Sequence, residues 1–143
     1  MKKVFSQKLH DKYDEPARKA VASWANMKWG FEIKDNPNRY GVDLICFRLG
    51  VPVGALEVEV RQEGFDRFGS IHKAHRKDKL TLNNLPVLFF ALTHDLSNAY
   101  WAKVENLKDC PLIEIPNKYV AKGEMFYDCP IQLFKYVDLK QLF

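Results

Sequence analysis

The chain has 143 residues, enough for one ordinary domain that buries a hydrophobic core without covalent staples. Apolar residues make up 47% and charged residues 28%, and no Gly/Ser-rich or proline-rich tract occurs, which excludes a disordered or fibrous protein. The net charge is +4, and most of the excess lies in one segment, residues 61–80. We therefore expect a single globular domain over residues 1–143 with one locally basic surface.

The longest apolar runs, such as residues 85–92, are too short to span a bilayer, and the N-terminal segment lacks an apolar secretory core. Cys46, Cys110 and Cys129 are odd in number and show no Cys-x-x-Cys spacing, so neither a disulfide framework nor a structural zinc site is indicated. These features predict a soluble, cytoplasmic protein with no membrane partner.

In chain order, the first predicted element is an amphipathic helix over residues 14–27, where apolar residues recur at helical spacing after an Asp-Glu-Pro start. A short alternating run follows at 31–34. Two strands, at about 42–48 and 52–61, are expected to form a hairpin joined around Leu49-Gly50. The first strand is apolar on both faces, which is typical of a strand covered on both sides.

In the second half, Ser70 is expected to cap a helix that runs to about residue 83, with Lys73, Arg76 and Lys77 on one face. The apolar run 87–92 predicts a central strand, and residues 99–104 are expected to pair with it. The remaining tail is predicted to be loop-rich. This order favours an α/β fold with a mixed central β-sheet flanked by helices.

The second strand of the hairpin carries three charged residues, Glu57, Glu59 and Arg61, on one face, because side chains alternate along a strand. If a three-residue connection at Leu49 to Val51 joins the strands, so that paired residue numbers sum to about 100, Asp43 lies opposite Glu57. The two Cβ atoms would then be roughly 5 Å apart. A slip of one residue would place them on opposite faces.

Carboxylates that converge in this way repel one another unless a cation lies between them, and oxygen ligands suit Mg²⁺ or Mn²⁺. Such a cation can activate water for phosphodiester hydrolysis. An ordinary solvated strand face is the alternative interpretation of the same residues.

The basic segment predicts a surface that binds nucleic acid, because phosphate-binding proteins gather positive charge in one place. A solvated helix could carry the same charges. The candidate phosphate contacts are Arg61, Arg67, Lys73, Arg76, Lys77 and Lys79.

Asp43, followed fourteen residues later by Glu57-Val58-Glu59 on an apolar strand, with a helix before and a basic helix after, resembles the PD-(D/E)XK nuclease superfamily. The resemblance covers roughly residues 14–105 and implies a restriction-endonuclease-like fold. It implies that Asp43 and Glu57 bind Mg²⁺ or Mn²⁺ and that Glu15 is an additional acidic residue near the metal. It further implies a metal-dependent nuclease that acts on DNA, with a homodimer as one expected arrangement.

Two positions depart from the family pattern: the usual lysine is Glu59, and the usual proline before the aspartate is Val42. Some members carry Glu at the first of these positions, so Glu59 is kept as a candidate catalytic residue. Lys73 or Lys77 is expected to replace the lysine near the scissile phosphate. The competing hypothesis is a catalytically inactive protein of the same fold that binds nucleic acid or a protein partner.

Overall fold

The structure is a computed structural model that describes residues 7–38, 41–61, 69–116 and 123–142, with side chains for 15–38, 41–61, 69–78, 80–116 and 123–140. Its first element is the α-helix α1 (Gln7–Trp29), which begins well before the predicted residue 14 and contains Pro16 in its interior. None of the helices in the described ranges is long and apolar enough to cross a membrane.

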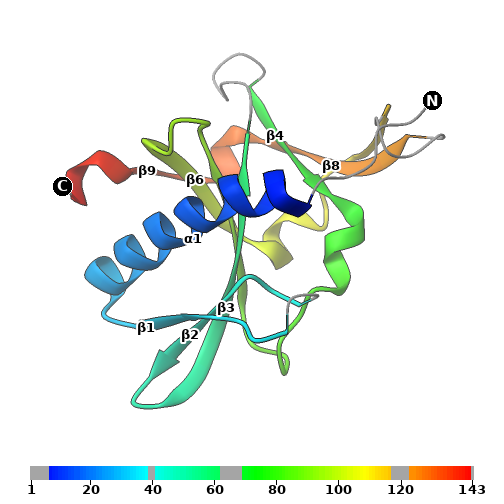
Figure 1. The fold of residues 1–143 in the computed structure, drawn as a ribbon. Helices are drawn as coiled ribbons and strands as arrows, with labels where there is room; N and C mark the ends of the chain where they lie inside the picture. The colour runs from blue at the N-terminus through cyan, green and yellow to red at the C-terminus, as the bar shows by residue number, and fades with distance from the viewer. Residues whose placement is uncertain (1–6, 39–40, 62–68, 117–122, 143) are drawn as a thin grey trace.

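The largest element is a six-stranded sheet with the order β1-β2-β3-β5-β6-β9 (Figure 1). Its strands β3 and β5 run parallel, while the other neighbouring pairs are antiparallel. The strand bounds are β1 (Glu32–Asp35), β2 (Leu44–Arg48), β3 (Val51–Val60), β5 (Val87–Leu92), β6 (Asn98–Lys103) and β9 (Lys135–Asp138). This architecture confirms the predicted α/β fold with a mixed central sheet, and the four strands predicted before residue 105 are all present.

A second, three-stranded sheet has the order β4-β8-β7, with β4 (Ser70–Ala74), β7 (Leu112–Ile115) and β8 (Glu124–Pro130). The predicted helix over residues 70–83 is therefore wrong: β4 is followed only by the short 3₁₀ helix η2 (His75–Lys79). Ile71 and Lys73 are buried while His72 between them is less so, which is strand periodicity. The tail predicted to be loop-rich supplies the two partner strands and β9.

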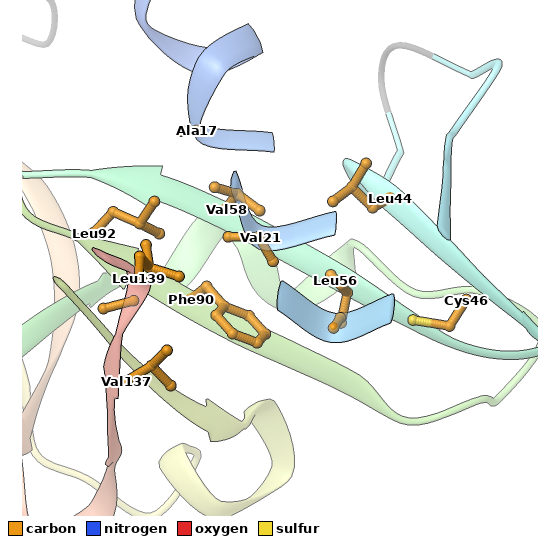
Figure 2. Close-up of a cluster of buried hydrophobic side chains, with 12 residues drawn as sticks. Ala17, Val21, Leu44, Cys46, Leu56, Val58, Phe90, Leu92, Val137 and Leu139 are labelled. Atoms are coloured by element: carbon orange, nitrogen blue, oxygen red, sulfur yellow. The ribbon is translucent and has the colours of Figure 1, made fainter. Parts of the chain in front are cut away.

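Helix α1 covers one face of the central sheet (Figure 1). Ala17 and Val21 of α1 are fully buried and face Leu56, Val58 and Phe90 of β3 and β5 (Figure 2). The small alanine side chains let the helix approach the sheet closely. Several aromatic rings extend this contact: Trp24 lies 5.8 Å from Phe90, and Trp29 lies 5.3 Å from Trp101 of β6, measured between ring centroids.

The second sheet covers the opposite face of the central sheet. Phe89 and Ala91 of β5 are fully buried there, in one cluster with Ile71, Tyr127 and Cys129 of the second sheet. The central sheet is thus flanked by one α-helix and one small sheet, in place of the two helices that the sequence predicts. The 3₁₀ helices η3 (Val104–Leu107), η4 (Ile131–Leu133) and η5 (Leu139–Leu142) occupy the connections.

The hairpin of β2 and β3 sets the register of the candidate site. Its turn has only two residues, Leu49 and Gly50, both with positive φ, so the pairs nearest the turn sum to 99. A bulge between Cys46 and Phe47 adds one residue on β3, and beyond it the pairs sum to 100, ending at Leu44 opposite Leu56. The predicted register is therefore confirmed at the end of the hairpin next to Asp43.

Candidate active site

Asp43, directly before β2, lies beside Glu57 of β3. The backbone N–H of Asp43 donates to Glu57 Oε1 at 3.1 Å, and the backbone N–H of Val58 donates to Asp43 Oδ2 at 2.8 Å. Each carboxylate is thus fixed by the backbone of the other residue's strand. The two groups that the sequence predicted to converge do so, on the face of β3 opposite α1.

Glu57 is nearly inaccessible to solvent, with 3% of its surface exposed. Burial and the neighbouring Asp43 raise the pKa of Glu57 to about 7, against a smaller opposing effect of Lys77. A buried carboxylate beside another carboxylate is stabilised by any cation that comes between them. Two neighbouring carboxylates of this kind are typical of a metal-binding site.

Lys77 extends from η2 toward these carboxylates. Its Nζ lies 3.8 Å from Glu57 Oε2 and 3.8 Å from Glu59 Oε2. Burial acts to lower the pKa of Lys77, but Glu59, Glu57 and Asp43 outweigh it, so its pKa lies above the ordinary value. Lys77 therefore stays protonated at neutral pH and provides a fixed positive charge, not a proton acceptor.

Glu59 follows on the same face of β3 and pairs with Arg61, whose Nη1 lies 3.4 Å from Glu59 Oε1. Burial acts to raise the pKa of Glu59, but the combined effect of the surrounding cations is larger and lowers it. The pKa of Glu59 is therefore below its ordinary value. In order of effect these cations are Arg61, Lys77, Arg76 and Lys73. Glu59 is thus an ionised anchor for Lys77 and Arg61.

Polar atoms remain unmatched beside this anchor. Within the described part of the chain, Glu59 Oε2 and the Nε and Nη2 atoms of Arg61 are buried without a hydrogen-bond partner. Buried guanidinium donors without partners are costly and rare, and a phosphate oxygen is a ligand that such donors bind well. The geometry of Arg61 is therefore compatible with the phosphate contact predicted for it.

The remaining basic residues do not form the predicted helical face. Lys73 is 1% exposed and its Nζ lies 2.9 Å from Asp78 Oδ1, so the structure places Lys73 in the second sheet, paired with Asp78, and not on a helix face. Arg76 is exposed on η2 and pairs with Glu124. Arg67 lies outside the described residues, as does the side chain of Lys79.

Glu15 is not joined to the Asp43–Glu57 pair. Its side chain is 60% exposed and forms an ion pair with Lys19 at 3.3 Å on α1, which packs on the other face of the sheet. Among the described side chains, no group of three or more His, Cys, Asp or Glu is placed to hold a metal ion. Mg²⁺ commonly uses only one or two protein carboxylates and completes its shell with water and substrate phosphate, so the donor set of Asp43 and Glu57 fits it.

Three further residues support the site, and the sequence reasoning missed them. Asn36, in the loop after β1, donates from its Nδ2 to Val42 O at 2.9 Å and from its backbone N–H to Asp43 O at 3.0 Å. Asp78 and Tyr127 hold the far side of η2. Asn36 and Asp78 are common turn and helix-end residues, and Tyr127 lies 70 residues beyond Glu57, so no local pattern connects them to the site.

Comparison with solved structures finds a similar fold in the bacterial homing endonuclease I-Ssp6803I. The TM-score is 0.50, the two chains are 18% identical, and the match covers 82% of this chain and 82% of that one. At this identity the likeness establishes only the fold, a mixed α/β fold that the two chains share. No family model and no curated protein matches the sequence.

Proposed function

We propose that the protein is a metal-dependent nuclease that hydrolyses phosphodiester bonds, with DNA as the expected substrate. The observation that carries this proposal is the placement of two carboxylates and one ammonium. The Glu57 carboxylate accepts from the Asp43 N–H, the Asp43 carboxylate accepts from the Val58 N–H, and the Lys77 ammonium lies 3.8 Å from Glu57. The fold that this chain shares with a homing endonuclease supports the same proposal. The PD-(D/E)XK resemblance accounts for the identity of the two carboxylates.

Asp43 and Glu57 would hold Mg²⁺ or Mn²⁺, which when bound supplies an acidified water and neutralises charge on the phosphate. The other roles in the proposed reaction belong to basic side chains of the protein. Lys77, fixed by Glu57 and Glu59 and protonated at neutral pH, stabilises the negative charge that develops on the phosphate oxygens. Lys77 thus replaces the lysine that Glu59 displaces from the family pattern, and Arg61 contacts a neighbouring phosphate.

This assignment gives Glu59 a specific role. It lies where the family carries a lysine, but its carboxylate holds two cations, Lys77 and Arg61, at the same place. The positive charge that a lysine on β3 would supply in the family is supplied here by Lys77 of η2, which also lies beside Glu57. Glu59 is therefore a positioning residue under this proposal and not a metal ligand.

The test is cleavage of labelled supercoiled plasmid, linear duplex, single strand and four-way junction DNA, with and without Mg²⁺ or Mn²⁺. Wild type is compared with Asp43→Asn, Glu57→Gln and Lys77→Met, and with Glu105→Gln, an exposed carboxylate on η3, as the matched control. We expect metal-dependent cutting that each of the three site variants lowers at least 100-fold and the control leaves unchanged, because a lost charge-stabilising group costs about that much.

One observation favours a second candidate, a catalytically inactive nuclease-fold protein that binds nucleic acid or a protein partner. Lys77 lies 3.8 Å from both Glu57 and Glu59, and Arg61 lies 3.4 Å from Glu59, so these two cations would neutralise both carboxylates without a metal. Wild-type protein that binds DNA with a steep salt dependence but cuts none of the substrates would support this candidate and contradict the nuclease.

A further inference from the structure

The short helix η2 carries Lys77 but has little of its own to hold it in place. It spans five residues, His75–Lys79, and no side chain caps its N-terminus. Hydrogen bonds in 3₁₀ helices have poor geometry, and such helices are short for that reason. The direction in which Lys77 points must therefore be set by contacts with the two sheets on either side.

Consecutive side chains of a 3₁₀ helix point about 120° apart, because one turn contains three residues. Arg76 forms an ion pair with Glu124 of β8, Lys77 points to β3, and Asp78 points to the second sheet. Fixing Asp78 therefore fixes the rotation of the helix about its axis, and with it the direction of Lys77.

Asp78 is held by two groups of the second sheet. Lys73 Nζ of β4 donates to Asp78 Oδ1 at 2.9 Å, and the Tyr127 hydroxyl of β8 donates to Asp78 Oδ2. The Lys73 ammonium also lies 5.3 Å from the centre of the Tyr127 ring. Both carboxylate oxygens are thus bound from strands that pair with each other, with Lys73 opposite Tyr127.

Stability alone does not explain why Lys73 is buried. Removing an ion pair from water costs free energy, and proteins in which apolar side chains of similar volume replace such a pair are often as stable. What an apolar replacement cannot supply is direction, because a carboxylate that accepts two bonds from fixed donors is held in one orientation. We infer that Lys73, Asp78 and Tyr127 form a positioning group that aims Lys77 at Glu57 and Glu59.

This inference rests on the proposed function for the importance of Lys77, but its geometry can be tested without any cleavage. The probe is limited acetylation with an N-hydroxysuccinimide acetate reagent, followed by mass spectrometry of each lysine. In wild type we expect slow acetylation of Lys77, whose side chain is 17% exposed, and fast acetylation of Lys19, which is 77% exposed. In Asp78→Asn and Tyr127→Phe we expect Lys77 to be acetylated at least threefold faster.

The matched control is His72→Gln, which removes the contact of His72 Nε2 with Asp128 Oδ1 at 3.2 Å, between the same two strands and next to Lys73 and Tyr127. Lys77 should stay protected in this variant. If cleavage is observed for wild type, Asp78→Asn and Tyr127→Phe should lower kcat about tenfold or more with KM little changed. His72→Gln should retain wild-type kinetics.

Tyr127→Phe removes a single hydroxyl and keeps the ring in the core, so it provides a folded test even if Asp78→Asn unfolds. Unchanged protection of Lys77 in folded Tyr127→Phe would overturn the inference, as would equal loss of protection in His72→Gln. A wild type that cuts no DNA would refute the proposed function alone, because the acetylation pattern would still report whether Lys77 is positioned by Asp78.

Discussion

At the scale of single residues, the site contains buried carboxylates, which destabilise the folded protein unless a cation neutralises them. Glu57 is buried beside Asp43, and its carboxylate would be better placed in water or as a neutral group. Proteins keep such arrangements where chemistry requires them, and perturbed pKa values cluster at functional sites for this reason. The consequence is a measurable conflict between stability and function.

The first prediction is that Glu57→Gln stabilises the protein in the presence of a chelator. The folded pKa of about 7 is above the unfolded value near 4.5, so the folded state binds the extra proton between these pH values. Wild-type stability should therefore fall as pH rises from about 4.5 to 7, and the variant should lack this fall. At pH 8 we expect a gain on the order of 1–3 kcal/mol.

Urea unfolding between pH 5 and pH 8 measures this difference, with Glu105→Gln as the control that should follow the wild-type curve. A Glu57→Gln variant that is less stable than wild type at pH 8 would contradict the account, because it would show that the carboxylate is well matched without a metal.

The second prediction concerns Asp95, in the turn between β5 and β6. Its Oδ1 accepts from the Ser97 hydroxyl at 2.7 Å, the Ser97 N–H at 3.0 Å and the Thr93 hydroxyl at 2.8 Å, and these bonds lower its pKa to about 2. A lowered pKa stabilises the fold above the unfolded value near 3.8, and that stabilisation is lost as pH falls toward 2.

Asp95→Asn should therefore unfold at lower urea concentration than wild type at pH 6, and the two midpoints should approach each other as the pH is lowered below 4. A gap between the midpoints that stays constant over this range would mean that the charge of Asp95 does not stabilise the turn.

At the scale of elements, the hairpin of β2 and β3 is the part of the fold that the sequence predicts best. Two apolar runs separated by Leu49-Gly50 predict its strands. The register in which paired residue numbers sum to 100, continued one step beyond the pair of Leu44 and Leu56, places Asp43 opposite Glu57. The sequence does not show that this register depends on a bulge at Cys46–Phe47, which compensates for a two-residue turn. The prediction reached the correct pairing with a turn one residue too long.

The third prediction is that Leu49→Asn stabilises this hairpin. Leu49 has φ of 52°, in the left-handed region that is unfavourable for leucine. Its side chain is 98% exposed, so no packing contact compensates for this backbone strain. Asn tolerates that region better, and we expect a gain of about 0.5–1 kcal/mol in the free energy of unfolding, read from the thermal midpoint. Gly50→Ala, at φ of 79°, should destabilise by about 1 kcal/mol. A decrease in stability for Leu49→Asn would show that Leu49 makes a stabilising contact.

The element that the sequence mispredicts is β4. Lys73, Arg76 and Lys77 have the spacing of a helix face, and a buried lysine is indistinguishable in sequence from a solvated one. Lys73 is buried because Asp78 and Tyr127 lie beside it, and Tyr127 comes from a strand more than 50 residues later. Local propensity cannot report a partner at that distance, and tertiary pairing decided the outcome.

At the scale of the whole molecule, the same limit explains the second layer. The central strands are apolar on both faces, which correctly predicts cover on both sides. The nature of the cover on the Glu57 face, a sheet of β4, β8 and β7, depends on segments that lie far apart in the chain. That sheet, through η2, carries Lys77 to carboxylates on the central sheet, so the two layers form the candidate site together.

If Asp43 and Glu57 hold a divalent cation, as we propose, the binding of that cation must depend on both carboxylates. Electron paramagnetic resonance of Mn²⁺ measures it directly, because the signal of free Mn²⁺ decreases as protein binds the ion. We predict one bound Mn²⁺ per chain in wild type and in Glu105→Gln, and at least tenfold weaker binding in both Asp43→Asn and Glu57→Gln. Wild-type protein that binds no Mn²⁺, or binding that survives both substitutions unchanged, would contradict the proposal.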